Sequence, residues 1–422
     1  MRSDLAETTQ LDLVEALQRV VDMGASDLHL KAGNRPLVRV NGRLARLDGD
    51  LEPLKPCDTE SALHDLLPAG RISDFERCNE IDFAYSAPGL GRFRVNAYRQ
   101  RGSIAIVMRT VSGAVPTIDA LALPDVVRRL AEEQRGIVLV TGTTGSGKST
   151  TVAAMIEHIN ATMCKHVVTI EDPIEYLFAD KQSSVDQREV GSDTESFATA
   201  LRQVLRQDPD VIFVGEMRDA ETVGTALSAA ETGHLVLSTL HTADAAETLN
   251  RILDFFEPHE QLKVRAMLAG TLKGIVSQRL VPALNAGGRV AVTEVLTMTG
   301  RVHDAIAEPK SAVGLTEIVA EGDFYGMHTF DQALYAATSQ GLVSMEVALR
   351  HATHPHDLKL LAASGGKLRT TMADVTPAAV VDAAHGPPPA PPAPDPVPAP
   401  AAAVAAADDR PRRGPSVAPP GR

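Results

Sequence analysis

The chain has 422 residues, of which 44% are hydrophobic and 23% are charged, and its formal net charge is −13. This composition is that of an ordinary globular protein, and it excludes a wholly disordered, collagen-like or disulfide-scaffold protein. The length exceeds one average domain of roughly 100–200 residues, so two or three domains are expected. The negative charge disfavours a non-specific nucleic-acid binder, because such proteins usually present a basic surface.

Cysteine usage and hydropathy indicate a soluble cytoplasmic protein. The chain has 3 cysteines, at positions 57, 78 and 164, and no pair has C-x-x-C spacing. A disulfide framework or a four-cysteine zinc site is therefore not expected. No uncharged apolar stretch approaches the roughly 20 residues that span a bilayer.

Residues 1–112 show the pattern of a small α+β domain. Apolar residues recur at helical spacing over 11–23, and Gly24 ends that helix. Short strand-like runs separated by Gly, Asn and Pro follow at Asp27–Leu30, Leu37–Val40, Ile81–Tyr85, Gly91–Tyr98 and Ile104–Arg109. Residues 113–119 are typical of a linker.

The pattern changes to alternating strands and helices over 120–362. Residues 329–350 and 355–362 are predicted to be helices that close this domain, and Arg289–Leu296 is predicted to add an edge hairpin. Residues 363–422 become rich in Pro and Ala and are predicted to be a disordered tail. Four β-branched runs, apolar on both faces, predict a parallel sheet covered by helices on both sides: Ile137–Thr141, Val167–Ile170, Val211–Val214 and Leu235–Leu240.

The first of these strands leads into a phosphate-binding loop. The loop has the pattern G-x-x-x-x-G-K-[ST] between a predicted strand and a predicted helix. Its backbone amides and the positive end of the helix dipole suit phosphate oxygens, Lys148 can reach the β/γ-phosphates, and the Ser149 hydroxyl can ligate Mg²⁺. The predicted nucleotide-binding residues are Gly142, Thr143, Thr144, Gly145, Ser146, Gly147, Lys148, Ser149 and Thr150.

Polar groups close the other three predicted strands, at the sheet edge where ligands bind in open parallel sheets. Glu216 follows one strand and suits a role as a second Mg²⁺ ligand, directly or through water. Glu175 or Glu171 can orient or deprotonate the attacking water. His241 or His234 can contact the γ-phosphate.

These motifs resemble the PilT-type pilus retraction ATPases of the type II and type IV secretion motor superfamily. The resemblance is carried by LVTGTTGSGKST (139–150), TIEDPIEY (169–176), LRQDPDVIFVGEMRD (205–219) and TGHLVLSTLHT (232–242), which match the Walker A, Asp box, Walker B and His box motifs in order. It implies a RecA-like ATPase core preceded by a PAS-like domain, a homo-hexamer, and nucleotide bound between the two domains.

The resemblance also implies a role for each site residue. Glu175 is similar to the water-activating base, Glu216 to the Walker B acid and His241 to the γ-phosphate contact. Arginines of the first domain complete such sites, and Arg94 and Arg109 match best, with two further arginines, at 99 and 101, as alternatives. The implied ligands are ATP and Mg²⁺, with Ser149 and Glu216 at the metal.

The implied function is a motor that couples ATP hydrolysis to type IV pilus retraction and twitching motility. It acts in the cytoplasm, at the inner face of the cell membrane, on an inner-membrane platform protein, with no nucleic-acid partner. The retraction motif A-I-R-N-L-I-R-E is kept only in parts at Val302–Glu308. Alternatives are therefore an accessory or divergent paralogue that drives pilus assembly or type II secretion, an ATP-binding regulatory scaffold with negligible hydrolysis, and a nucleic-acid motor.

Overall fold

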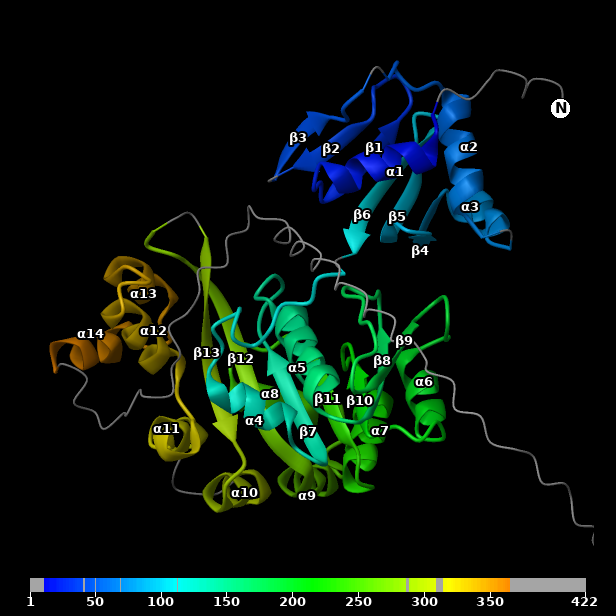
Figure 1. The fold of residues 1–422 in the computed structure, drawn as a ribbon. Helices are drawn as coiled ribbons and strands as arrows, with labels where there is room; N and C mark the ends of the chain where they lie inside the picture. Colours follow the sequence, from blue (N-terminus) through cyan, green and yellow to red (C-terminus); the bar gives the residue numbers. More distant parts are fainter. Residues whose placement is uncertain are drawn as a thin grey trace, which may run out of the picture. The chain divides into compact units, whose positions relative to one another are not determined.

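The computed structural model describes residues 11–364 except 41, 50, 69, 112, 286–287 and 309–313. The tail predicted over 363–422 therefore lies, from residue 365 onward, outside the described residues. The described chain forms two β-sheets with their associated helices (Figure 1).

The first sheet is antiparallel, with the strand order β3-β2-β1-β6-β5-β4. Its five predicted strands are confirmed, whereas β3 and the helices α2 and α3 were not predicted. One apolar face packs on α1 and α2. Two of the apolar residues at helical spacing in 11–23, Val14 and Val21, are nevertheless 60% and 41% exposed. The elements are α1 (Leu13–Asp22), β1 (Asp27–Lys31), β2 (Leu37–Val40), β3 (Arg43–Arg46), α2 (Pro56–Leu66), α3 (Ile72–Cys78), β4 (Glu80–Ala87), β5 (Gly91–Gln100) and β6 (Ser103–Val111).

The second sheet has the strand order β13-β12-β7-β11-β10-β8-β9. Strands β12, β7, β11, β10, β8 and β9 run parallel, and β13 pairs antiparallel with β12, which confirms the four predicted core strands and the edge hairpin. The strands are β7 (Gly136–Thr141), β8 (His166–Glu171), β9 (Ser184–Glu189), β10 (Val211–Val214), β11 (Leu235–Leu240), β12 (Leu272–Pro282) and β13 (Arg289–Thr297).

Helices cover both faces of the second sheet (Figure 1), which explains why its central strands are apolar on both sides. Helices α4 and α5 pack on one face, and α6 to α11 form the other layer. Their bounds are α4 (Asp125–Ala131), α5 (Lys148–Thr162), α6 (Phe197–Val204), α7 (Ala220–Glu231), α8 (Ala245–Asp254), α9 (Gln261–Thr271), α10 (Gly300–Ala307) and α11 (Leu315–Ala320).

A separate small core joins the last helices to β12 and β13. Phe330, Leu334 and Leu358 pack there against Val281 and Val292. The helix predicted over 329–350 is wrong as one element, because the chain turns at Gly341, whose φ of 72° is outside helical values. The structure has instead α12 (Phe330–Ser339) and α13 (Met345–His351), followed by α14 (Pro355–Ala363).

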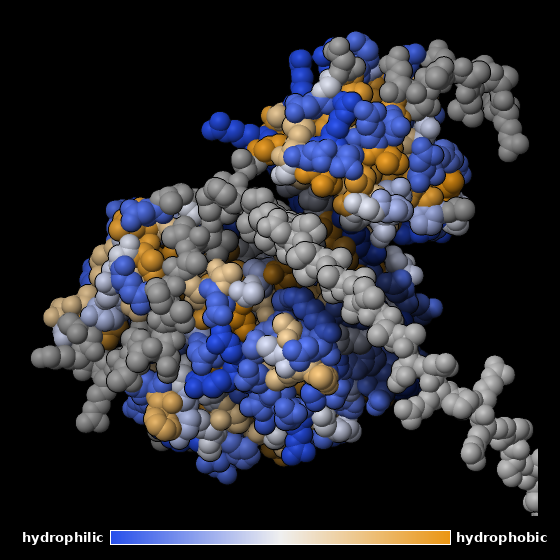
Figure 2. Space-filling model, in the orientation of Figure 1, coloured by the Kyte–Doolittle hydropathy of each residue, from blue (hydrophilic) through white to orange (hydrophobic). Residues whose placement is uncertain are grey.

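The described surface drawn in Figure 2 is mostly hydrophilic, with small apolar patches. Over the described residues, no helix is both long and apolar enough to cross a membrane.

A buried carboxylate on β13 holds the helix that follows the His box. Glu294 is 7% exposed, and its Oε1 accepts a hydrogen bond from the Ala245 amide at the start of α8, at 3.0 Å. Burial raises the pKa of Glu294 to about 7, and the nearby Asp244 adds to this, while Arg279 and the amides of Ala245 and Phe330 act in the opposite direction. Glu294 thus anchors the start of α8, which follows His241 by four residues.

Glu294 is expected to make stability fall as pH rises from about 5 to about 7. The folded-state pKa lies above the usual 4.5, so the native state binds more protons than the unfolded state between these values. A shift from 4.5 to about 7 corresponds to ~3 kcal/mol. The free energy of unfolding is measured by urea unfolding at pH 5, 6 and 7.5. We expect Glu294→Gln to abolish its decrease with rising pH. Parallel pH profiles for the wild type and the variant would contradict the prediction.

Candidate functional site

The loop after β7 is shaped to receive an anion. Gly142, Gly145 and Gly147 have positive φ values of 146°, 79° and 91°, and α5 begins at Lys148. A Cβ atom at Gly142 would lie 2.4 Å from the Gln278 carbonyl oxygen, and one at Gly147 would lie 2.7 Å from Gln278 Nε2. Glycine is therefore required at both positions by conformation and by space.

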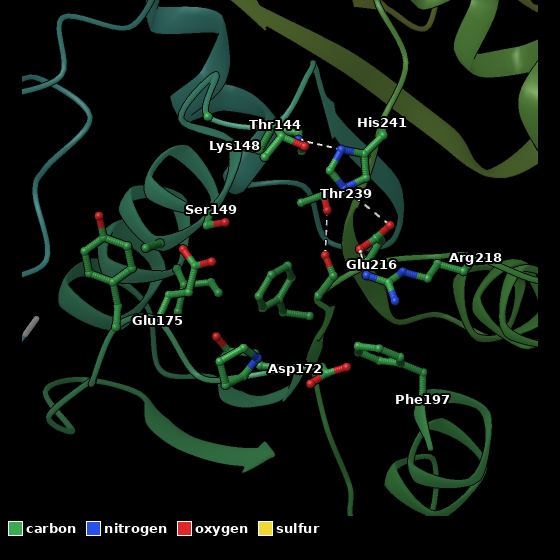
Figure 3. A pocket seen from close by; sticks show the side chains of 18 of the residues that line it. Thr144, Lys148, Ser149, Asp172, Glu175, Phe197, Glu216, Arg218, Thr239 and His241 are labelled. Carbon is green, nitrogen blue, oxygen red and sulfur yellow. Dashed lines mark hydrogen bonds and ion pairs between the residues drawn. The ribbon is translucent and has the colours of Figure 1, made fainter. Parts of the chain in front are cut away.

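Lys148 and His241 meet at the mouth of this loop (Figure 3). Lys148 Nζ donates to the carbonyl oxygens of Gly142 at 2.8 Å and Thr143 at 3.1 Å, and lies 3.3 Å from His241 Nδ1. An ammonium group only donates hydrogen bonds, so Nδ1 of His241 is the acceptor and its ring proton lies on Nε2.

Glu216 completes a chain of polar contacts across the site. His241 Nε2 lies 3.4 Å from Glu216 Oε1, and Arg218 Nη2 donates to Glu216 Oε2 at 2.8 Å (Figure 3). Burial alone would raise the pKa of Glu216. The hydrogen bond and charge of Arg218, with the charge of Lys148, outweigh burial and hold that pKa below its usual value. Glu216 is thereby kept as an anion, the form that ligates Mg²⁺.

For Lys148, burial prevails over the neighbouring charges in setting the pKa. Desolvation lowers the pKa of Lys148, although the charges of Glu216 and Glu175 act to raise it. Lys148 is only 8% exposed, so the N–H groups of its ammonium point to the loop and the site rather than to bulk water. A cation held in this way is ready to exchange carbonyl partners for phosphate oxygens.

The two glutamates that follow β8 have different surroundings. Glu171 is buried and accepts hydrogen bonds from Thr169 Oγ1 at 2.6 Å and Gln187 Nε2 at 3.2 Å, and burial raises its pKa. Glu175 is exposed and lies across the pocket beside Ser149 (Figure 3). The geometry therefore favours Glu175 over Glu171 as the group that contacts a water molecule.

Part of the predicted loop lines a cavity of about 200 Å³ together with predicted strand-end residues. The loop residues at this cavity are Thr144, Gly145, Lys148 and Ser149, whereas Gly147 and Thr150 line a second cavity. The first cavity includes Ser149, Lys148, Glu175, Glu216 and His241, so the structure brings these five together. His234 lies instead at the amino end of β11, where its Nδ1 is 3.0 Å from the Ala229 carbonyl oxygen. The second cavity, of about 370 Å³, shares Lys148 and Ser149 and is otherwise bounded by Leu121, Leu123, Leu280, Ala291 and Arg289 among others.

The predicted arginines are not among the residues that line either cavity. Arg94 and Arg109 are exposed and stand directly opposite each other on β5 and β6. Arg109 Nε donates instead to Asp27 Oδ1 at 2.8 Å. Their roles at the nucleotide stay predictions.

Three residues at or next to the site were not predicted. Arg218 lies in the Walker B motif (205–219), but no sequence pattern indicates that its side chain pairs with Glu216. Arg92 Nη2 donates to Glu189 Oε2 at 3.1 Å, and the same oxygen accepts the Ile174 amide of the Asp box. Gln278 contacts the loop from β12, a strand that the sequence pattern did not reveal.

The donor set fits a nucleotide with Mg²⁺. The buried hydroxyl of Ser146 has no hydrogen-bond partner in the described structure, so the loop holds a polar atom still to be satisfied. The loop supplies donors for phosphate, and Ser149 and Glu216 supply oxygens for a hard cation. Within the described residues, no group of three or more His, Cys, Asp and Glu side chains is arranged to hold a metal ion.

Comparison with known proteins places these features in one family. The family described as "Type II/IV secretion system protein" matches residues 92–350. The type IV pilus retraction ATPase PilT of Pseudomonas aeruginosa is 44% identical over 347 residues, which cover 82% of this chain and 100% of that protein. The type IV pilus ATPase PilU of the same organism is 41% identical over 357 residues, covering 85% and 93%.

Solved structures agree. A crystal structure of the pilus retraction motor PilT with bound ADP superposes with a TM-score of 0.77 at 44% identity, and the match covers 83% of this chain and 99% of that one. The ATPase DotB of Legionella pneumophila gives a TM-score of 0.70 at 28% identity, covering 85% and 97%.

Proposed function

This chain is an ATPase that belongs to the type II/IV secretion system protein family, and we propose that it is the motor that retracts a type IV pilus. The observation that carries the proposal is the grouping of Lys148, Glu175, Glu216 and His241 around one cavity beside the glycine-rich loop. The likeness to PilT of P. aeruginosa over the whole of that protein supports retraction as the work performed.

Each group has a distinct part in hydrolysis. The loop amides and Lys148 hold the β- and γ-phosphates, and Glu175 orients and deprotonates the attacking water. Ser149 and Glu216 would hold Mg²⁺, which when bound would neutralise charge on the phosphates. The apolar walls of the second cavity, Leu121, Leu123 and Leu280, suit the base of the nucleotide.

His241 is suited to report whether a nucleotide is present. Its ring lies between Lys148 and Glu216, so a phosphate that recruits the Lys148 ammonium takes away one of its two neighbours. We propose that His241 then turns its contacts to the γ-phosphate and that hydrolysis reverses the change.

The motor is proposed to act as a homo-hexamer in the cytoplasm, docked on an inner-membrane platform protein. Arg94 and Arg109 are proposed to reach the phosphates when the first sheet closes over a nucleotide, from the same or a neighbouring subunit. Closure and opening would then convert chemistry into movement. Pilus assembly or type II secretion by a divergent paralogue is the second candidate, because the stretch 302–308, which covers most of α10 and its C-cap residue, departs from the retraction motif.

Deletion of the gene, with surface pili scored by microscopy, tests the direction of work. We expect pili to accumulate without retracting and twitching to stop. Loss of pili would contradict retraction and favour assembly.

Complementation with Glu175→Gln separates a motor from a regulatory scaffold, since this variant is designed to bind ATP without hydrolysing it. Full rescue by this variant would exclude the motor.

A further inference from the structure

Gln278 contacts the phosphate loop from behind, on a strand distant in sequence. It lies on β12, is 3% exposed and uses both ends of its side-chain amide. Nε2 donates to the carbonyl oxygen of Ser146 at 2.8 Å, and Oε1 accepts from the Thr151 hydroxyl at 2.6 Å. One amide thus joins the loop to the first turn of α5.

The contact with Ser146 fixes the direction of one peptide group. In a trans peptide the C=O and N–H bonds point to opposite sides. Because the Ser146 carbonyl is held toward Gln278, the amide hydrogen of Gly147 points away from it. The backbone N–H groups of such loops are the donors that hold phosphate.

Two backbone hydrogen bonds flank this peptide, from the Ser146 amide to the Thr143 carbonyl oxygen at 3.2 Å and from the Thr151 amide to the Gly147 carbonyl oxygen at 3.0 Å, but neither uses the Ser146 carbonyl or the Gly147 N–H. Gly147 has a φ of 91° and no side chain, so its own conformation is permissive. The space that a Cβ atom would need at Gly147 is taken by Gln278 Nε2, at 2.7 Å. The close approach therefore serves the hydrogen bond rather than apolar packing.

We propose that Gln278 is a positioning residue for nucleotide binding, which orients the Ser146–Gly147 peptide so that its N–H faces the phosphates. The inference rests on ATP binding at this loop, as proposed above, and is independent of the direction of pilus movement. It predicts a defect in the binding of ATP and ADP alike, because both carry the phosphates next to the loop.

Two variants separate the Ser146 contact from the Thr151 contact. Gln278→Glu keeps the shape and the acceptor for Thr151 but replaces the donor to Ser146. Thr151→Val removes the hydroxyl and leaves the Ser146 bond in place. Gln278→Met removes both polar contacts at similar side-chain volume. It replaces Gln278→Glu as the test variant if the buried carboxylate of Gln278→Glu prevents folding.

The experiment measures the Kd of fluorescent ADP and ATP analogues on the full chain, with kcat and KM from steady-state hydrolysis. We expect Gln278→Glu and Gln278→Met to weaken both Kd values roughly 10-fold or more and to raise KM, with kcat at saturation within about 3-fold. Thr151→Val is expected to stay within about 3-fold of the wild type in Kd.

The outcomes are distinguishable from failure of the proposed function. Wild-type protein that binds neither nucleotide would overturn the nucleotide site itself. Wild-type binding with unchanged Kd values in both Gln278 variants would overturn only the positioning role. A loss in Thr151→Val equal to that in Gln278→Met would show that Gln278 anchors α5 and would also overturn it.

Discussion

Replacement of Lys148 by alanine is expected to reduce ATP hydrolysis by about 100-fold or more, to background. Within the loop from Gly142 to Ser149, Lys148 is the one cation, and its Nζ already lies among acceptors that phosphate oxygens can replace. A preorganised donor at the position where charge develops typically contributes a factor of about 10²–10³ to kcat. Steady-state phosphate release from purified protein measures the effect.

A matched lysine elsewhere gives the control. Lys273 pairs with Glu133 at 3.3 Å, and both side chains are about one third exposed, so Lys273→Ala removes an equal charge with little expected effect. Both variants should keep the wild-type circular dichroism spectrum. Normal turnover in Lys148→Ala would remove this loop from the catalytic site.

The nucleotide site was predictable because its parts are local in sequence. A strand, a glycine-rich loop and a helix are contiguous from Gly136 to Thr162, and one motif covers their junction. The convergence of Glu175, Glu216 and His241 followed from a general property of parallel sheets, whose strand ends share one edge. The structure brings all three to the loop without any further assumption.

The parts that were missed depend on contacts between distant segments. Gln278 is one of several polar residues in β12, whose sequence is LKGIVSQRLVP, and its partner Ser146 precedes it by 132 positions. Strand β9 escaped prediction because its sequence, SVDQRE, is mostly polar, as suits the edge of a sheet. The position of Arg109 beside Asp27 depends on the pairing of β1 with β6, which no local pattern specifies. The roles of Arg94 and Arg109 accordingly remain predictions.

Glu175→Gln is expected to reduce hydrolysis by about 100-fold or more while ATP binding stays close to that of the wild type. The amide keeps the size of the carboxylate but cannot accept a proton from water, and general-base catalysis contributes roughly 10²–10⁴-fold. Because the Glu175 side chain is exposed and makes no hydrogen bond in the described structure, its replacement should not alter the free energy of unfolding. Single-turnover hydrolysis and analogue binding, measured on the same protein, separate the two effects.

The same substitution at Glu216 and at Glu171 is expected to have a different effect from Glu175→Gln, which makes the two variants controls for it. Glu216→Gln weakens the pairing with Arg218 and His241 and removes the anion proposed to hold Mg²⁺, so its turnover should require more Mg²⁺. Glu171→Gln keeps an acceptor oxygen for Thr169 and Gln187, and its hydrolysis should remain within about 10-fold of the wild type, because Glu171 is already held by those contacts. If Glu175→Gln turned over normally and Glu171→Gln did not, the base would be Glu171, and the loop after β8 would have to open to expose it.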